Sequence, residues 1–246
     1  DLFKRALLVD GSMYCHTGHT LNVLDPESGS QIRQHTFEEN NTYVYGPVYR
    51  PADGRLYYTV HDQFGPNVVR AVDPVTAEVV WELAIPSRRM QTRPVLGDKF
   101  LYVVSGETNV DRVDQNELVA VDCDRQEIAW RVQTRAALKP PVVGQDRVFV
   151  AAHGTDEGFL TAVDSDNEAI AWSHRVVDGE GYVSRPSVGK SRVTVAIENH
   201  QIHTRTIDDG TRDGSLQIPL AEDVQPAQDG ERLYVAGGAN VWALDR

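Results

Sequence analysis

Short stretches of alternating apolar and polar residues recur along the whole chain and predict β-strands. Five of them read LYYTV, FLYVV, RVFVA, RVTVA and RLYVA, and they begin at residues 56, 100, 147, 192 and 232. Each follows a proline and a short turn, the prolines standing at positions 47, 94, 141, 186 and 226. Period-two alternation of β-branched and aromatic residues is typical of strands, and the Asp-Gly and Gly-Asp pairs mark hairpins. No stretch carries a convincing helical pattern.

A second repeat runs in register with the first. Its clearest copies are AVDPVTAEVVW, AVDCDRQEIAW and AVDSDNEAIAW, and in each the Trp lies eight residues after the Asp. Weaker copies surround Asp25, Asp208 and Asp245, so that consecutive Asp anchors are 48, 49, 42, 44 and 37 residues apart. Repeats of about 40 to 50 residues are typical of propeller blades.

Together the two repeats predict an all-β protein built from blades of four antiparallel strands, which is the plan of a β-propeller. We place six blades in a single domain over residues 1–246, at 5–37, 44–85, 92–134, 139–177, 183–220 and 224–246. Two alternatives stay open, a six-bladed ring and a part of a larger propeller of seven or eight blades. An unclosed arc would expose strand edges, which natural proteins avoid.

The motif AVD-x-x-T/D-x-E-x-x-W, followed by a Pro-led strand, resembles the repeat of pyrroloquinoline quinone (PQQ)-type propellers. Proteins with this repeat include quinoprotein dehydrogenases and outer-membrane assembly factors of the BamB kind. The resemblance covers nearly the whole chain and implies the propeller fold. It also implies a place outside the cytoplasm, at the cell surface, in the periplasm or secreted. It does not imply one activity, because a fold serves many functions.

The charge balance argues against two classes of partner. The formal net charge is -12, with 36 acidic residues against 24 basic ones, so electrostatic binding to nucleic acid or to an anionic membrane is not expected. Twenty of the basic residues are arginines, and this acidic, lysine-poor composition is similar to that of proteins from salt-loving organisms. An ordinary acidic secreted protein is the alternative. No apolar run reaches the roughly 18 residues of a transmembrane helix.

Recurrent Trp and Asp residues are predicted to be structural. The three Trp residues occupy one repeat position and are expected to lock neighbouring blades, as the resemblance also implies: Trp81, Trp130 and Trp172. The three Asp residues begin the turn between the last two strands of a blade, where a carboxylate can accept backbone N–H bonds: Asp73, Asp122 and Asp164.

Polar residues near the blade-opening prolines are the candidate ligand-binding set. Arg93, Lys139 and Arg185 precede these prolines in three consecutive units, and Gln225 stands near the corresponding position. In propellers the opening strand lines the central channel, so these side chains are expected to converge there and hold a small anion or carboxylate. The alternative is that each cation pairs with an acidic neighbour on the next blade.

Two short clusters contain residues that can bind transition metals. Cys15, His16 and His19 form C-H-x-x-H, and His200 with His203 forms H-x-x-H, both expected in strand connections. Neither cluster has a third or fourth ligand that can be named, so we predict solvated histidines and no metal site. The connection from residue 105 to 117 is rich in oxygen-bearing side chains, but it lacks an EF-hand pattern and is expected to be a solvated acidic loop, on a face where partners dock.

These features predict a non-catalytic propeller that acts as a scaffold for a protein partner or a ligand, with no catalytic residues and no cofactor. Signatures of serine hydrolases, phosphate loops and dinucleotide-binding turns are absent from the sequence. The alternative is a quinoprotein resembling alcohol or sugar dehydrogenases, or a fragment of one, with PQQ and calcium. The resemblance implies adjacent cysteines in such enzymes, whereas Cys15 and Cys123 belong to different blades. A BamB-like assembly role is a special case of the scaffold.

Overall fold

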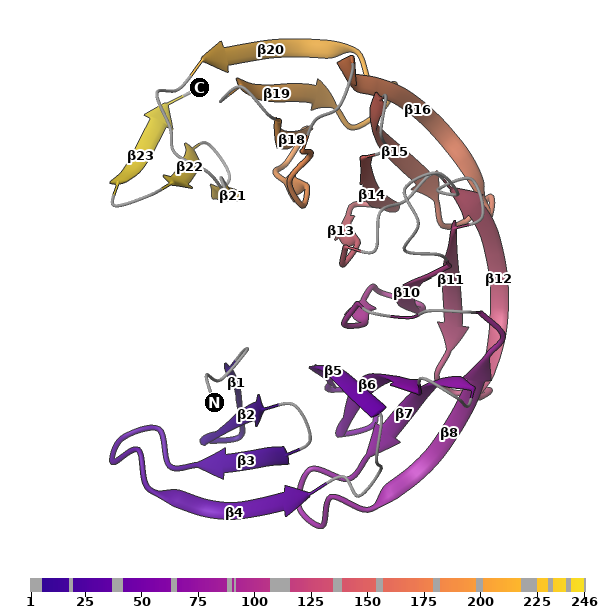
Figure 1. Cartoon of the computed structure of the whole chain (residues 1–246), viewed down its shortest axis with the longest axis vertical. Coiled ribbons are helices and arrows are strands. Elements are labelled where there is room, and N and C mark those ends of the chain that lie inside the picture. Colours follow the sequence, from indigo (N-terminus) through magenta and orange to yellow (C-terminus); the bar gives the residue numbers. More distant parts are fainter. Residues whose placement is uncertain are drawn as a thin grey trace. The chain divides into compact units, whose positions relative to one another are not determined.

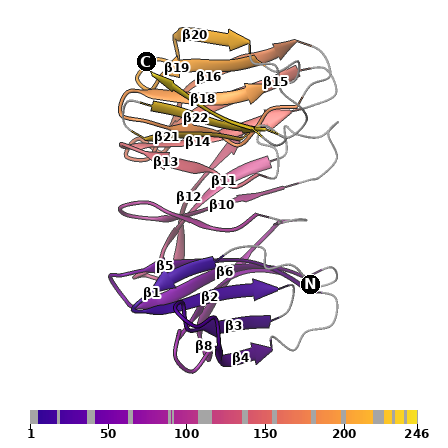
Figure 2. The same cartoon turned by 90° about the vertical axis from the view of Figure 1, so that its left-hand side faces the viewer.

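The computed structural model describes most of the chain, and every regular element in it is a β-strand. The described residues are 6–17, 20–36, 42–62, 66–87, 90, 92–106, 116–134, 139–153, 157–178, 182–197, 201–217, 225–229, 232–237 and 240–245. Within these ranges there is no helix, and hence none that is long and apolar enough to cross a membrane (Figures 1 and 2). The predicted all-β class is confirmed.

Strands pair with their neighbours in chain order, as Figure 1 shows for each sheet. The first sheet contains β1 (Ala6–Val9), β2 (Ser12–Thr17), β3 (Thr20–Leu24) and β4 (Gln31–Thr36). The second contains β5 (Thr42–Arg50), β6 (Arg55–Asp62), β7 (Asn67–Val72) and β8 (Val79–Ile85). The third contains β9 (Val95–Leu96), β10 (Leu101–Ser105), β11 (Asn116–Asp122) and β12 (Glu127–Thr134).

The remaining three sheets follow the same plan. The fourth contains β13 (Val142–Gly144), β14 (Arg147–His153), β15 (Glu157–Asp164) and β16 (Ala169–Asp178). The fifth contains β17 (Ser187–Val188), β18 (Arg192–Ile197), β19 (Gln201–Thr206) and β20 (Arg212–Gln217). The sixth contains β21 (Gln225–Asp229), β22 (Arg232–Gly237) and β23 (Asn240–Asp245). The four-stranded antiparallel unit is therefore confirmed in five sheets, and the last has three strands.

The chain divides into two compact units, each of which is described by itself. The first comprises Asp1–Ser105 with Ala120–Ala129, and the second comprises Gly106–Val119 with Trp130–Arg246. The first two sheets belong to the first unit and the last three to the second, while the third sheet contributes strands to both. The single domain proposed from the sequence stays a prediction.

The turn between the third and fourth strands of a sheet is built on an Asp carboxylate. Oδ1 of Asp73 accepts the backbone N–H groups of Val75 at 2.7 Å and Thr76 at 2.8 Å, and these bonds, that from Thr76 above all, hold the pKa of Asp73 below its usual value. Asp25, Asp122 and Asp164 each accept the same pair of N–H groups, two and three residues further on.

The fourth residue after each of these Asp residues adopts a left-handed backbone. Its φ lies between 56° and 70° at Gly29, Ala77, Gln126 and Glu168. Glycine takes this conformation at no steric cost, whereas other residues pay roughly 1–2 kcal/mol. Three of the four turns therefore hold a strained non-glycine residue, which the Asp hydrogen bonds and the flanking strands keep in place.

In the fifth sheet this turn begins at Thr206, so the anchor that the sequence placed at Asp208 is wrong by two residues. The N–H of Thr206 donates to Thr211 O at 3.0 Å, as that of Asp73 does to Glu78 O. The left-handed position is Gly210, with a φ of 70°. Asp209 supplies the carboxylate instead. The hydroxyl of Thr206, followed by the N–H of Thr211, lowers its pKa to about 2.

The recurrent Trp residues lie on the outer strands and are buried. Trp81 pairs with Ala71 and Trp172 with Ala162, and a β-bulge follows each pair. The indole N–H of Trp172 donates to Ile207 O of the fifth sheet at 2.8 Å. A Cβ built on Gly210 would lie 2.6 Å from the Trp172 ring, so the ring packs directly on this glycine. Trp172 thus joins the fourth sheet to the turn of the fifth.

Polar contacts join the sheets of the first unit. Arg33, which pairs with Val23 at the position that Trp81 has in the second sheet, donates to Val75 O at 2.6 Å. The guanidinium of Arg50 on β5 binds both carboxylate oxygens of Asp124, at 2.8 and 2.9 Å. Each contact crosses from one sheet to the turn of the next, because these turns offer carbonyl and carboxylate oxygens.

We expect Trp172→Ala to destabilise the protein by about 3–5 kcal/mol, since it removes a buried indole and leaves a cavity. Trp172→Phe should cost less, because it retains the ring contact with Gly210 and loses mainly one hydrogen bond of about 1 kcal/mol. Urea denaturation measures both. Trp242→Phe, at a half-buried Trp in β23, is the control. Equal losses for the Ala and Phe variants would contradict the packing role of the ring.

Candidate functional site

Lys139 and Arg185 are two of the predicted channel cations. Each contacts the segment that precedes the first strand of the other's sheet. The ammonium group of Lys139 donates to Val183 O, and its Nζ lies 3.7 Å from the centre of the Tyr182 ring. Nη2 of Arg185 donates in return to Pro141 O at 3.3 Å. Both side chains are half-buried. The structure thus places these two cations in adjacent segments, and the contacts described here are with backbone carbonyls and an aromatic ring.

Arg93 and Gln225 complete the predicted set, but fewer of their contacts are described. Arg93 is half-buried and precedes the buried Pro94 and β9. Gln225 begins β21, where its backbone pairs with Ala236, and its side chain lies outside the described residues. Arg93 belongs to the first unit and the other three residues to the second. Anion binding by the four residues stays a prediction.

The predicted Cys/His clusters lie within strands where they are described. Cys15 and His16 belong to β2 and are 2% and 3% exposed, and burial raises the pKa of the Cys15 thiol. Their expected place in a solvated connection is therefore wrong, because the apolar residues around them draw β2 into the core. His19 and His200 lie outside the described residues. The described part of the chain contains no group of three or more His, Cys, Asp or Glu residues that could hold a metal.

Of the acidic connection between residues 105 and 117, the structure describes only the two ends. Residues 107–115 lie outside the described residues, and with them Glu107, Asn109, Asp111 and Asp114. Ser105 and Asn116, at the two ends, are 0% and 1% exposed. The ends of the connection are thus anchored in the core.

His203 is a buried titratable group that the sequence placed in solvent. It lies in β19, pairs with Val195 and is 7% exposed. Burial, followed by the charges of Arg212 and Arg205, lowers its pKa to about 4. Its Nε2 lies 3.2 Å from Gln201 Oε1, which fits a neutral ring that donates at Nε2. The pattern of the strand would not have located it, because His203 and the adjacent Ile202 are both buried and burial does not alternate at this point of β19.

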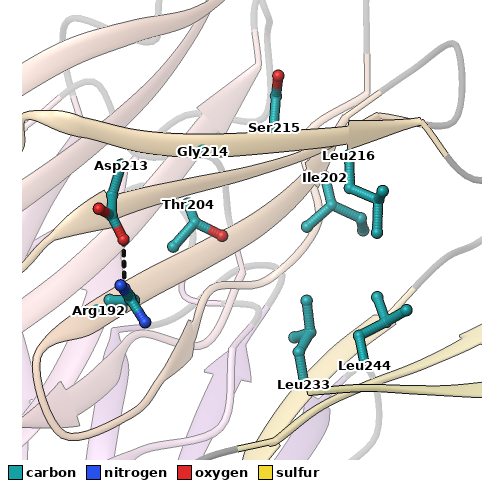
Figure 3. Close-up of a pocket in the computed structure, with 9 residues that line it drawn as sticks. All are labelled: Arg192, Ile202, Thr204, Asp213, Gly214, Ser215, Leu216, Leu233 and Leu244. Carbon is teal, nitrogen blue, oxygen red and sulfur yellow. Dashed lines mark hydrogen bonds and ion pairs between the residues drawn. The ribbon is translucent and has the colours of Figure 1, made fainter. Parts of the chain in front are cut away.

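A cavity of about 280 Å³ lies between the fifth and sixth sheets, both in the second unit. Apolar side chains from both sheets line it, and Figure 3 shows Ile202 and Leu216 on one side with Leu233 and Leu244 on the other. Arg192 and Asp213 form an ion pair at its margin. Sequence reasoning missed this cavity, although Gly214 on its wall occupies the repeat position of Trp172, as the pairing of Thr204 with Gly214 shows.

Comparison with protein families matches residues 17–139 and 65–246 to the family described as outer membrane protein assembly factor BamB. Among solved structures, BamB from Moraxella catarrhalis is similar, with a TM-score of 0.70 and 16% identity over 97% of this chain and 70% of the other. A sequence search of curated proteins found no match. The structural likeness confirms the predicted β-propeller fold, and at this identity it shows the fold alone.

Because the imidazole of His203 is buried, we predict that the stability of the protein falls in acid. His203 takes up a proton near pH 6.5 in the unfolded chain, but only near pH 4 in the folded protein. The contribution of the neutral ring to the free energy of unfolding is therefore fully present above pH 6.5. It is lost as the pH falls from 6.5 to 4. At about 1.4 kcal/mol per pKa unit, the full loss is about 3–4 kcal/mol.

We therefore expect the free energy of unfolding of the His203→Gln variant to change less between pH 7 and 4.5 than that of the native protein. Urea denaturation at several pH values measures the difference. A Ser215→Ala variant, at the exposed position of β20 that pairs with His203, is the control and should follow the native profile, because it removes no ionisable group. Parallel profiles for the native protein and His203→Gln would refute the assignment.

Proposed function

This chain belongs to the family of the outer membrane protein assembly factor BamB, and on that premise we propose that it is a non-catalytic propeller that binds a protein partner outside the cytoplasm. Membership of this family carries the proposal. The family's name describes an assembly factor, a role that consists in binding other proteins. The extracytoplasmic place is part of the same proposal.

The hydrogen bonds of Lys139 and Arg185, two of the predicted channel cations, support this proposal over a quinoprotein. A cofactor with several carboxylates needs charged donors directed at it. In the described arrangement the ammonium group of Lys139 donates to Val183 O and Nη2 of Arg185 donates to Pro141 O, so these donors are directed at backbone carbonyls. Both bonds join the segments that precede β13 and β17, which supports a structural contribution of these two side chains.

Exposed valines supply one candidate contact surface. Val75, Val79 and Val80 lie in the β7–β8 turn and at the start of β8, and they are 57%, 48% and 44% exposed. Grouped exposed apolar side chains mark interaction sites more often than isolated ones do. We place the partner contact of the first unit here.

A photo-crosslinking residue at Val75 or Val79, introduced in the organism that makes the protein, is expected to capture one defined protein. The same residue at exposed Glu127 should capture none, and Val75→Asp with Val79→Asp should abolish capture at neighbouring positions. Both valines are exposed, so the double variant should keep the native melting temperature. Equal capture from all positions, or none, would contradict the proposal.

The cofactor prediction is tested by adding PQQ, with and without calcium, in high salt while following cofactor absorbance and thermal stability. We expect no saturable change, because two of the inner cations are engaged with carbonyls. Saturable binding that Arg93→Ala removes without loss of fold would favour the quinoprotein alternative.

A further inference from the structure

Two arginines lie directly opposite each other on the last two strands of the fifth sheet. Arg205 on β19 pairs with Arg212 on β20, just after the β-bulge. The second and fourth sheets have an apolar pair at this position: Val72 with Val79, and Val163 with Ile170. Side chains directly opposite are about 5 Å apart at Cβ, and like charges at that distance destabilise the sheet. The fifth sheet thus has two cations where two other sheets have an aliphatic contact.

Neither guanidinium has a carboxylate partner among the described residues. Nη1 of Arg205 donates to Gly210 O at 2.7 Å, and its Nη2 donates to Arg175 O of the fourth sheet at 3.1 Å. The Nε–H of Arg205 is buried and has no acceptor in the described part of the chain. Backbone carbonyls therefore hold this guanidinium in place, and one buried donor is left for another group.

Arg70 shows how a buried arginine is compensated elsewhere in the chain. Its Nη2 lies 2.7 Å from Glu82 Oε2 on the neighbouring strand. A charge that is withdrawn from water is costly unless it is paired and hydrogen-bonded. In the fifth sheet the nearest carboxylate along the strand, that of Asp213, binds Arg192 instead. The described residues thus leave the charge of the arginine pair uncompensated.

The imidazole of His203 is affected by the same charges. His203 precedes Arg205 by two residues and therefore lies on the same face of β19. Burial, followed by the charges of Arg212 and Arg205, lowers the pKa of His203. Burial, followed by the charge of Arg212, also lowers the pKa of Arg205. In a chain with a net charge of -12, this face of the fifth sheet is therefore locally positive.

The arginine pair can be reached from solvent. Arg212 is exposed and Arg205 is half-buried. Val79 and Ile170, at the same position as Arg212 in their own sheets, are 48% and 45% exposed. The pair faces the fourth sheet, and both the fourth and the fifth sheet have four strands. The positive site thus lies at the rim between two sheets that are both complete.

We propose that Arg205 and Arg212 bind a divalent oxyanion, sulfate or phosphate. The anion accepts the buried Nε–H of Arg205 and the N–H groups of Arg212, because guanidinium donors match the geometry of oxyanions and form strong charge-assisted bonds. Two positive charges favour a divalent ion over a monovalent one. The site belongs to the second unit and does not rest on the partner contact proposed for the first.

Sulfate is the probe, because it is divalent across the working pH range. In ¹⁵N-labelled native protein we expect it to shift the NMR resonance of the Arg205 Nε–H in a saturable way. The Nε–H of Arg131, whose guanidinium is paired with Glu117 at 2.9 Å, should not shift. Chloride at the same ionic strength should leave Arg205 unshifted. Acetate, which is monovalent, should bind at least about tenfold more weakly than sulfate.

Arg212→Ile introduces the residue that the fourth sheet has at this position, and it should weaken sulfate binding at least about tenfold, because a charge-assisted contact is lost. Arg212 is exposed, so the variant should keep the native fold. Arg131→Ile is the matched control. It removes the same charge from an arginine that is paired with a carboxylate, and it should bind sulfate as the native protein does.

Absence of a saturable shift at Arg205 would overturn the proposal, as would an equal shift with chloride, which would show charge screening alone. Equal affinity for acetate would overturn the assignment of a divalent ion, and undiminished binding by Arg212→Ile would remove the second guanidinium from the site. Failure of the crosslinking experiment would leave these results unaffected, so the two proposals are tested separately.

Discussion

The packing of an outer-strand side chain against the turn of the following sheet is the contact on which the described interfaces depend. A four-stranded sheet buries its apolar face only when another sheet covers it. Trp172 on the outer strand β16 fills the space between the fourth sheet and the β19–β20 turn. Its ring packs on Gly210, and its indole N–H donates to Ile207 O. The Asp-built turn holds these acceptor groups in a fixed place.

The same repeat position carries three different chemistries, and each changes the interface. Trp172 fills it with an aromatic ring, and Arg33 reaches across it with a guanidinium that donates to Val75 O. Gly214 leaves it open, and the cavity appears at that interface. The residue at this strand position thus differs from interface to interface, and with it the contact that the outer strand makes.

The function proposed here follows from family membership, and the contacts of two cationic side chains agree with it. Lys139 and Arg185 were predicted to bind an anion, and the donors described for them meet backbone oxygens of the segments that precede β17 and β13. Family membership and this arrangement both favour a binding role.

Strand alternation and the Asp-to-Trp spacing by themselves determined the β-class, the four-stranded unit and the repeat, because each is a local pattern that recurs in register. The turns around Asp73 and Asp164 were equally local. Tertiary structure alone decided the rest: that His203 is buried, that Lys139 and Arg185 meet carbonyls, and that Gly214 borders a cavity. These properties depend on which sheet covers which face, and no spacing along one strand contains that information.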